Sequence, residues 1–168
     1  NDIPLWHAMQ RQGVRPSDLS ESTINTDRVD RFYEVHIEQG RILDESDDKL
    51  GLVTSVRAPV RYEVTVEGAY DHSGATPMEL RKDALVAAGE MITDVEDVAK
   101  QRENVVATVG DIIAHDGAIN KVCGRVTFPL DIRSEILDMR DDTEEEVLEA
   151  FVETAEHRDI GIDTNEID

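Results

Sequence analysis

The chain has 168 residues, enough for one sizeable hydrophobic core or two small ones. Its 38 acidic and 17 basic residues give a net charge of -21, which argues against a nucleic-acid partner, because binding phosphates requires lysines and arginines gathered on one face. No apolar run approaches the roughly 18 residues that cross a bilayer, so we expect no membrane partner.

The acidic residues are spread along the whole chain, and arginine outnumbers lysine among the cations. This pattern predicts a protein adapted to high salt, as in a halophile; the alternative is an ordinary acidic enzyme surface. Cys123 is the only cysteine, which rules out an intrachain disulfide, and no signal-peptide pattern follows Asn1. We therefore expect a soluble cytoplasmic protein, with any targeting segment of a longer parent lying outside these residues.

The first third of the chain predicts a short helix over residues 3–12 that ends at Gly13. A polar, irregular stretch leads to a strand over residues 32–37, and a helical turn follows near Ile42. Pro59 interrupts the next apolar segment, so we place a domain boundary there. The predicted domains are residues 1–58 and 59–168.

Beyond the boundary, residues 61–67 alternate as a half-buried strand, and residues 83–99 form an amphipathic helix. The apolar stripe of that helix is predicted to be Leu85, Ala88, Ile92, Val95 and Ala99. Strands over residues 105–113 and 126–132 follow. Pro129 lacks an amide donor and is predicted at an unpaired edge or a bulge.

A last helix is predicted over residues 144–158, capped by Asp142 and Thr143, with a final strand within residues 160–167. The order strand, helix, strand, strand, helix, strand predicts an α+β class. The expected architecture is a ferredoxin-like split βαββαβ domain, an antiparallel sheet with two helices on one face. It is preceded by a partial catalytic domain.

Residues 33–40 combine a half-apolar strand pattern with His36, Glu38 and Gln39, followed by Gly40. A strand that ends in polar side chains and a glycine turn often presents ligands at the edge of a sheet. The alternative is a structural histidine whose ring is satisfied by its neighbours. The local sequence leaves both interpretations open.

Four more side chains have a functional and a structural interpretation. His72, in a turn-rich loop, is either solvated or donates to an oxyanion. For Asn120, as for any isolated asparagine in a loop, the favoured interpretation is an ordinary turn residue. Arg133 either pairs with Asp131, two residues away on the outward strand face, or binds a substrate carboxylate with its guanidinium fork. Arg61, first on its strand, has the same two interpretations.

No complete catalytic set is present. One histidine with one nearby carboxylate is too few for a two-metal site. The chain has no glycine-rich phosphate loop, no paired cysteines and no serine elbow.

Taken together, these residues resemble the amidase family of N-carbamoyl-L-amino-acid hydrolases and allantoate amidohydrolases, within the wider group of dinuclear metallopeptidases. The resemblance covers nearly the whole chain in the right order. Its motifs are His36-Ile37-Glu38-Gln39-Gly40, Leu50-Gly51-Leu52-Val53-Thr54, His72-Ser73-Gly74-Ala75-Thr76-Pro77-Met78, Arg81-Lys82-Asp83-Ala84, Thr108-Val109-Gly110, Asn120, Asp131-Ile132-Arg133 and Gly161-Ile162-Asp163.

The resemblance implies a catalytic domain with two divalent metal ions, zinc or manganese, with cobalt or nickel as alternatives, and an inserted lid domain that forms a homodimer. It makes His36 a metal ligand, Gln39 a substrate contact, and His72 the lid histidine that polarises the scissile carbonyl. Asn120 and Arg133 would hold the carboxylate of a carbamoyl or ureido substrate. Arg61 is a further candidate for that carboxylate. The implied reaction is hydrolysis of a C–N bond by metal-activated water.

The chain also departs from the family pattern. The remaining metal ligands and the glutamate that acts as general base have no counterpart here, so the chain resembles a central portion that is inactive by itself. Cys123 stands where the family commonly has proline. Two alternatives remain: a dimerisation module without a catalytic role, and a dipeptidase or aminoacylase of the wider group.

Overall fold

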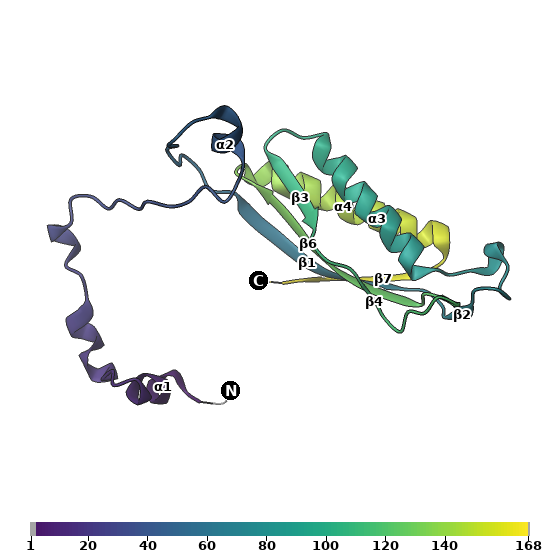
Figure 1. Cartoon of the computed structure of the whole chain (residues 1–168), viewed down its shortest axis with the longest axis horizontal. Coiled ribbons are helices and arrows are strands. Elements are labelled where there is room, and N and C mark those ends of the chain that lie inside the picture. Colours follow the sequence, from purple (N-terminus) through teal and green to yellow (C-terminus); the bar gives the residue numbers. More distant parts are fainter. Residues whose placement is uncertain (1–2, 168) are drawn as a thin grey trace. The chain divides into compact units, whose positions relative to one another are not determined.

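The computed structural model describes residues 3–167, which divide into two units, the first ending at Gly51 and the second beginning at Leu52. The described helices of the first unit are α1 (Leu5–Arg11), η1 (Pro16–Ser22), η2 (Thr26–Arg28) and α2 (Ile42–Ser46) (Figure 1). Gly13 has a left-handed φ of 77° just after α1, as predicted for a glycine that ends a helix. Within residues 3–167, no helix combines the length and apolarity that crossing a membrane requires.

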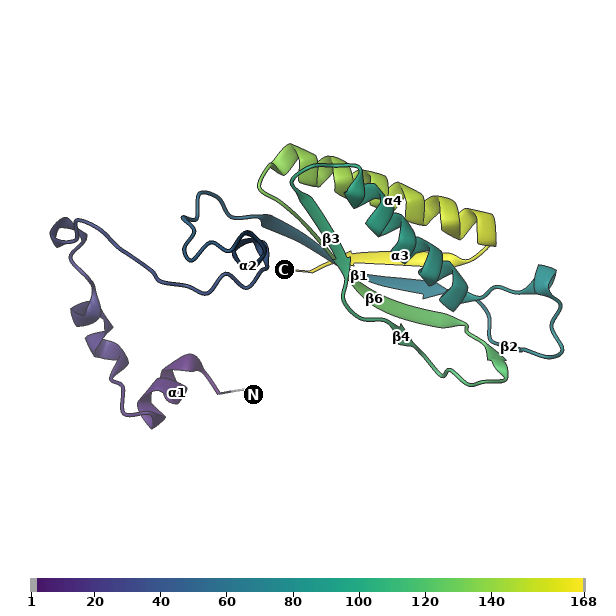
Figure 2. The same cartoon turned by 45° about the horizontal axis from the view of Figure 1, so that its top comes forward.

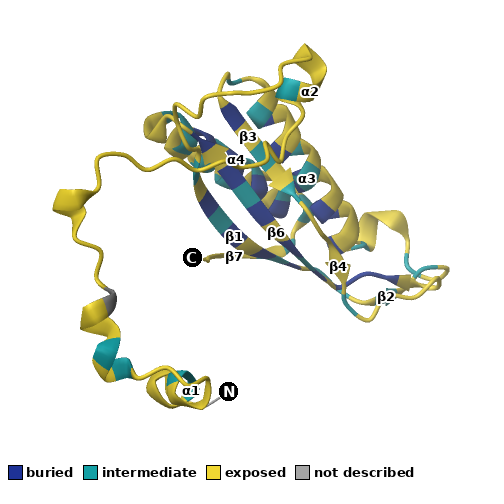
Figure 3. Cartoon of the chain, turned by 60° about the vertical axis from the view of Figure 1, so that its left-hand side comes forward, coloured by how far each residue is buried: buried dark blue, intermediate teal, exposed yellow. Residues whose placement is uncertain are grey.

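The strand predicted over residues 32–37 is wrong, because this segment pairs with no strand among the described residues. Phe32, Val35 and Ile37 are 83%, 98% and 75% exposed. Figure 3 shows the coil between η2 and α2 as exposed along its length. Alternating apolar residues form a strand only where a neighbouring strand supplies the ladder hydrogen bonds, and the described part of the first unit contains no strand.

The second unit is built on an antiparallel sheet, which confirms the predicted α+β class. Its strands lie in the order β3-β6-β1-β7, and β4 pairs with β6 on the same edge as β3, farther along the strand. In sequence, strand, helix, strand, strand, helix and strand alternate as predicted, and both long helices cover one face (Figure 2). The elements are β1 (Ala58–Glu67), β2 (Asp71–His72), η3 (Met78–Leu80), α3 (Ala84–Lys100), β3 (Val105–Val109), β4 (Ile113–Ala114), β5 (Lys121–Val122), β6 (Arg125–Ser134), α4 (Leu137–Arg158) and β7 (Gly161–Glu166).

The hydrophobic core lies between this sheet and the two helices. Every second residue from Val60 to Val66 in β1 and from Val126 to Ser134 in β6 is buried on the helix side, as the strand alternation predicts. At its centre, Phe128 of β6 meets Phe151 of α4 edge to face, with ring centroids 5.9 Å apart. The opposite face of the sheet carries polar side chains.

The predicted start of α3 is confirmed, because Asp83 caps the helix by accepting hydrogen bonds from the amides of Leu85 and Val86. The predicted stripe is only partly right. Ala88 and Val95 are buried, but Leu85 is 42% exposed. The buried side of α3 is formed by Ala84, Ala87, Ala88, Met91, Val95 and Val98.

The predicted start of α4 is wrong, because the helix begins at Leu137 rather than near residue 144. Thr143 is fully buried inside the helix, and its hydroxyl donates to the Met139 carbonyl at 2.6 Å instead of capping an end. The amide of Ile136 donates to the Ser134 hydroxyl just before the helix. A threonine followed by acidic residues resembles a cap, and only the packing shows that it faces the core.

One further prediction about strands is wrong, and the prediction for Pro129 is confirmed in part. Residues 105–113 form two short strands, β3 and β4, instead of one. Pro129 lies in β6, an interior strand, opposite Glu63 of β1. On its other side, the described pairing with β3 ends at Leu130 and that with β4 begins at Thr127. Pro129 therefore occupies the interruption between these two partners, where the sheet tolerates the missing donor.

Candidate functional site

Two glycines fix the path of the loop that carries His72. The Gly68 amide donates to the Gly124 carbonyl at 2.9 Å, and a Cβ on Gly68 would lie 2.0 Å from the carbonyl oxygen of Lys82. A Cβ on Gly124 would lie 2.5 Å from the ring of Tyr70. The end of β1 lies so close to the start of α3 and of β6 that no side chain fits at either position. Glycine is therefore required at both.

From this point the chain forms the two-residue ladder of β2 and β5, in which His72 lies opposite Lys121. The amide of the next residue, Ser73, donates to the Asn120 carbonyl at 3.0 Å. The structure therefore brings His72 and Asn120 together. Both line a shallow hollow of about 310 Å³, with Tyr70, Asp71 and Lys121.

The imidazole of His72 is held in one orientation by its own loop. The Gly74 amide donates to His72 Nδ1 at 3.0 Å. Because an amide N–H can only donate, Nδ1 is the acceptor, and this hydrogen bond assigns the proton of the neutral ring to Nε2. The side chain is exposed, so the Nε2–H group can donate to a ligand.

A second group of predicted residues lies on the open face of the sheet. Arg133 Nε and Nη2 donate to Asp131 Oδ1 and Oδ2 at 2.9 and 2.6 Å, and Arg61 Nε donates to Oδ2 at 3.3 Å. Hydrogen bonding from Arg133, and then from Arg61, holds the pKa of the Asp131 carboxyl below its ordinary value against the opposing effect of burial. Asp131 in turn raises the pKa of Arg133.

These side chains line a groove of about 650 Å³, here called the arginine groove, whose cations are Arg57, Arg61 and Arg133. Val56, Val106 and Leu130 contribute apolar surface. Three guanidinium groups against the single carboxylate of Asp131 make the groove cationic in a strongly acidic chain. The arginine groove is thus suited to bind an anion such as a carboxylate.

The structure does not bring Asn120 and Arg133 together. Arg61, beside Arg133, lies near the start of β1, whereas β2 follows the far end of that strand. The six residue-to-residue steps from Arg61 to Glu67 correspond to about 20 Å at the usual rise per residue of a strand. Figure 2 shows β2 beyond the end of β1. The His72 hollow and the arginine groove are separate sites within one chain.

His36 and Gln39 belong to the first unit. The Nδ1–H of His36 donates to the Ile37 carbonyl at 2.5 Å, which leaves the lone pair of Nε2 for a ligand such as a metal ion. Gln39 has a left-handed φ of 58°. Glu38 accepts hydrogen bonds from the amides of Ile42 and Leu43 at 2.7 and 3.2 Å, so its carboxylate caps α2.

The described residues do not by themselves fit a metal centre. Among residues 3–167, no three histidine, cysteine or acidic side chains gather closely enough to hold a metal ion. His36 provides one nitrogen, and the neighbouring Glu38 carboxylate is engaged by backbone amides. A metal centre would need further ligands from outside these residues.

Two arginines with a place in these sites were not predicted. Arg57 lines the arginine groove, and Arg81 donates to the loop that carries His72. Arg81 stands in the Arg81-Lys82-Asp83-Ala84 motif, which supports the family resemblance but predicts no role for its guanidinium. No local pattern marks Arg57, since its position depends on where β1 begins.

No family model matches the chain. It is 33% identical over 165 residues to the N-carbamoyl-L-amino acid amidohydrolase of Geobacillus stearothermophilus, covering 98% of this chain and 40% of that protein. It is 37% identical over 132 residues to the allantoate amidohydrolase of Bacillus subtilis, covering 78% of this chain and 32% of that protein.

Among solved structures, a hydantoinase/carbamoylase family amidase from Burkholderia ambifaria matches with a TM-score of 0.75 and 30% identity, over 79% of this chain and 32% of that one. The chain thus spans well under half the length of each of these three proteins. The motifs, fold and relatives agree. The chain therefore belongs to the hydantoinase/carbamoylase family of amidases.

Proposed function

We propose that this chain forms part of a metal-dependent amidohydrolase that cleaves a carbamoyl or ureido C–N bond of an N-carbamoyl-L-amino acid or of allantoate. The observation that carries the proposal is the fixed imidazole of His72, with Nδ1 occupied by the Gly74 amide and Nε2–H turned to solvent. The names of the two curated relatives support this choice of substrate class.

In this proposal His72 donates from Nε2 to the carbonyl oxygen of the scissile bond and stabilises the negative charge that develops there. Arg133 binds the substrate carboxylate, with Arg61 beside it in the arginine groove. Asp131 orients Arg133 by occupying its Nε and Nη2 edge. Asn120 and Gln39 contact the substrate.

We further propose that His36 is one ligand of a centre with two divalent metal ions, zinc or manganese, or alternatively cobalt or nickel. Such a centre supplies an activated water when it is bound. Since the described residues assemble no ligand set, the other ligands and the general base would come from outside this chain. We therefore expect the 168-residue chain alone to be inactive.

Residues 1–58 are proposed to be part of the catalytic domain and residues 59–168 to be a lid that forms a homodimer. The separation of Asn120 from Arg133 supports a dimer, because two copies could bring residues from opposite ends of the sheet to one substrate. The sheet ends in two strands, β3 and β7, that can pair further. A cytoplasmic location, favoured by the single buried Cys123, completes the proposal.

The test is ammonia release from N-carbamoyl-L-methionine and from allantoate by the complete gene product that contains this chain, with zinc or manganese supplied after dialysis against a chelator. His72→Gln should lower kcat by about 100-fold or more. His157→Gln, on the exposed side of α4, is the matched control and should change kcat less than twofold, by the usual behaviour of surface substitutions. Equal activity of the two variants would refute the role of His72.

Two results would count against the remaining parts of the proposal. Turnover of either substrate by the 168-residue chain with metal would contradict its predicted inactivity. A second candidate function, a dimerisation module without catalysis, is favoured by the missing ligand set. It would be supported if the complete gene product released no ammonia yet the chain dimerised on size-exclusion chromatography. A monomer in about 1 M salt, where charge repulsion is screened, would argue against any dimer.

A further inference from the structure

Arg81 forms an unusual set of contacts beside His72. Its Nε donates to the Thr76 carbonyl at 3.0 Å, and its Nη2 donates to the Ser73 carbonyl. Among the described residues it pairs with no carboxylate, although the chain contains 38 acidic side chains. The half-buried guanidinium of Arg81 thus donates its side-chain hydrogen bonds to two backbone carbonyls.

The two carbonyls flank the amide that holds the imidazole. Ser73 precedes Gly74, whose amide donates to His72 Nδ1, and Thr76 follows two residues later. The amide of Thr76 also donates to the His72 carbonyl at 3.0 Å, so the segment forms a closed turn. By joining both sides of this turn, Arg81 fixes where the Gly74 N–H points.

We propose that Arg81 is a positioning residue for His72: it holds the turn so that Gly74 occupies Nδ1 and Nε2–H faces the ligand. This inference rests on the proposed function for its purpose, but the arrangement itself is a property of this chain. A lysine cannot reproduce it, because one ammonium is a compact point charge, whereas the planar guanidinium offers two donors in a fixed fork.

Loss of the guanidinium should loosen the turn without unfolding the unit. The path into the loop is set separately by Gly68 and Gly124 and by the ladder of β2 with β5. The two carbonyls released by Arg81 would be solvated by water, since the neighbouring residues Gly74 and Ala75 are exposed. The expected defect is therefore a disordered imidazole on an intact fold.

The experiment is nuclear magnetic resonance on the 168-residue chain at about pH 8.5, where imidazole rings are neutral. It compares the native chain with Arg81→Ala and Arg81→Lys. In Arg81→Ala, amide exchange of Gly74 and Thr76 should accelerate by about tenfold or more, the scale of a lost charge-assisted hydrogen bond. The separation between the Nδ1 and Nε2 nitrogen shifts of His72 should shrink as the hydrogen bond to Nδ1 is lost. Arg81→Lys should recover neither signal fully.

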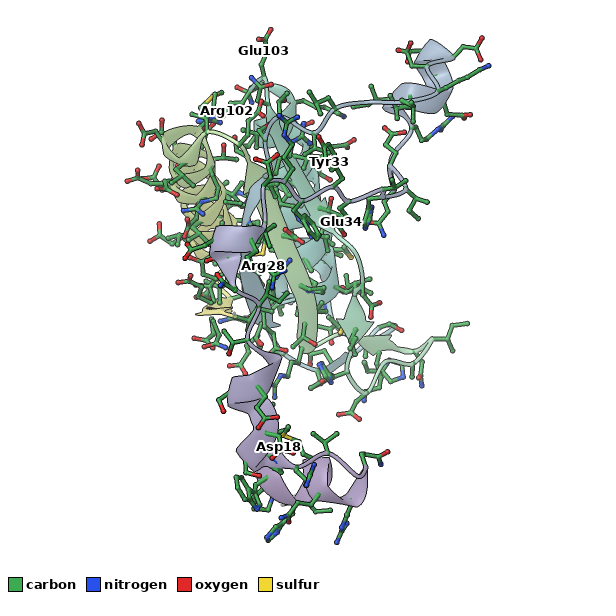
Figure 4. The ribbon with its side chains drawn as sticks, turned by 90° about the vertical axis from the view of Figure 1, so that its left-hand side faces the viewer. Asp18, Arg28, Tyr33, Glu34, Arg102 and Glu103 are labelled. Atoms are coloured by element: carbon green, nitrogen blue, oxygen red, sulfur yellow. The ribbon has the colours of Figure 1, made fainter. Side chains whose placement is uncertain are left out.

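Chemical rescue separates positioning from a general loss of stability. Ethylguanidinium added to Arg81→Ala should restore protection of the Gly74 amide, whereas ethylammonium at the same concentration should not. The control variant is Arg102→Ala, which removes another half-buried arginine, one that pairs with Glu146 from the turn between α3 and β3 (Figure 4). It should leave the His72 nitrogen shifts unchanged.

The proposal would be overturned if amides of Val64 and Phe128 in the sheet accelerated as much as that of Gly74, or if the His72 shifts were the same in all variants. Should Arg81→Ala not fold, Arg81→Lys provides the same comparison: native exchange at Gly74 in that variant would refute the need for a guanidinium. No turnover is measured, so failure of the proposed hydrolase function would leave these results unchanged.

Discussion

Arg133 donates two parallel hydrogen bonds to Asp131, Nε to Oδ1 at 2.9 Å and Nη2 to Oδ2 at 2.6 Å. The pair lies on one strand, two residues apart, and a third contact from Arg61 on β1 ties it to the neighbouring strand. The arginine groove thus has an internal counterion that fixes the guanidinium before any ligand arrives.

The first prediction concerns Asp131→Asn. The pKa of this carboxyl is lowered in the fold, so it contributes stability above its unfolded pKa and loses it as the pH falls through the folded value. Because the pair is partly exposed, we expect the variant to lose about 1 kcal/mol or less at pH 7, with no difference from the native chain in strong acid.

Urea unfolding at several pH values measures this difference. Asp163→Asn on β7 is the control, since it removes an exposed carboxylate that has no ion pair among the described contacts of the same sheet. A loss at pH 7 that persisted unchanged at pH 2 would contradict the ion-pair explanation.

The second prediction concerns Asp94, a carboxyl whose pKa is raised in the fold instead of lowered. Burial raises the pKa of Asp94 on α3, and the charges of Asp97 and Glu90 add to the effect. A raised pKa contributes stability below the unfolded value and loses it as the pH rises, so the ionised carboxylate destabilises the fold at neutral pH. Asp94→Asn should therefore stabilise the chain by up to about 1 kcal/mol at pH 7 and by nothing below about pH 3.

Thermal unfolding followed by circular dichroism at the two pH values is the measurement. Glu103→Gln removes the same charge from an exposed residue, labelled in Figure 4, and should have little effect because Glu103 is not buried. A lower melting temperature of Asp94→Asn at pH 7 would mean that the ionised carboxylate stabilises the fold, contrary to this prediction.

The third prediction compares two glycines. A Cβ on Gly68 would meet the Lys82 carbonyl at 2.0 Å, whereas a Cβ on Gly89 in α3 meets nothing within 4 Å. Gly68→Ala should cost at least about 2 kcal/mol, because backbone must move. Gly89→Ala should stabilise the chain by about 0.5–1 kcal/mol, since alanine is the better helix former.

Chemical denaturation of both variants tests this contrast, with equal slopes required for a valid comparison. Destabilisation by Gly89→Ala would mean that α3 is crowded at that position. A neutral Gly68→Ala would mean that the end of β1 does not approach α3 as closely as described.

The fourth prediction concerns salt. Carboxylates crowd the outer side of α4, where Glu144, Glu145, Glu149 and Glu153 line one hollow. Their repulsion is screened over about 10 Å at 0.1 M salt and about 3 Å at 1 M, so the melting temperature should rise with potassium chloride across that range. The double variant Glu149→Gln, Glu153→Gln should show a shallower rise. If the double variant showed the same rise in melting temperature as the native chain, the repulsion would arise outside Glu149 and Glu153. If the melting temperature of the native chain did not rise, the support for salt adaptation would be lost.

Local signals predicted some elements correctly and misplaced others. The helix predicted from residue 83 begins where expected, and Asp83 caps it, because a cap depends only on neighbouring residues. Thr143 carries the same local signal but faces the core, and this depends on how α4 packs against the sheet. The strand predicted over residues 32–37 fails for a related reason, since pairing needs a partner that local alternation cannot supply.

The same limit applies to the sites. Residue type and the family resemblance predict His72, Asn120 and Arg133 as site residues, and these roles remain proposals. The separation of Asn120 from Arg133 was not predictable, because it follows from the register of β1 and of the short β2–β5 ladder. The contacts of Arg81 depend on two carbonyls whose positions no sequence pattern specifies.

The ladder between β2 and β5 places a constraint on evolution. Inserting or deleting one residue between Gly68 and His72 would shift the pairing by one position and turn the imidazole to the other face of the ladder, while the sheet and both helices stayed intact. The connection from β4 to β5 is different, because it contains the fully exposed Ile119 and can change in length ahead of Asn120. Selection should therefore act more strongly on the spacing between Gly68 and His72 than on the length of the loop that contains Ile119.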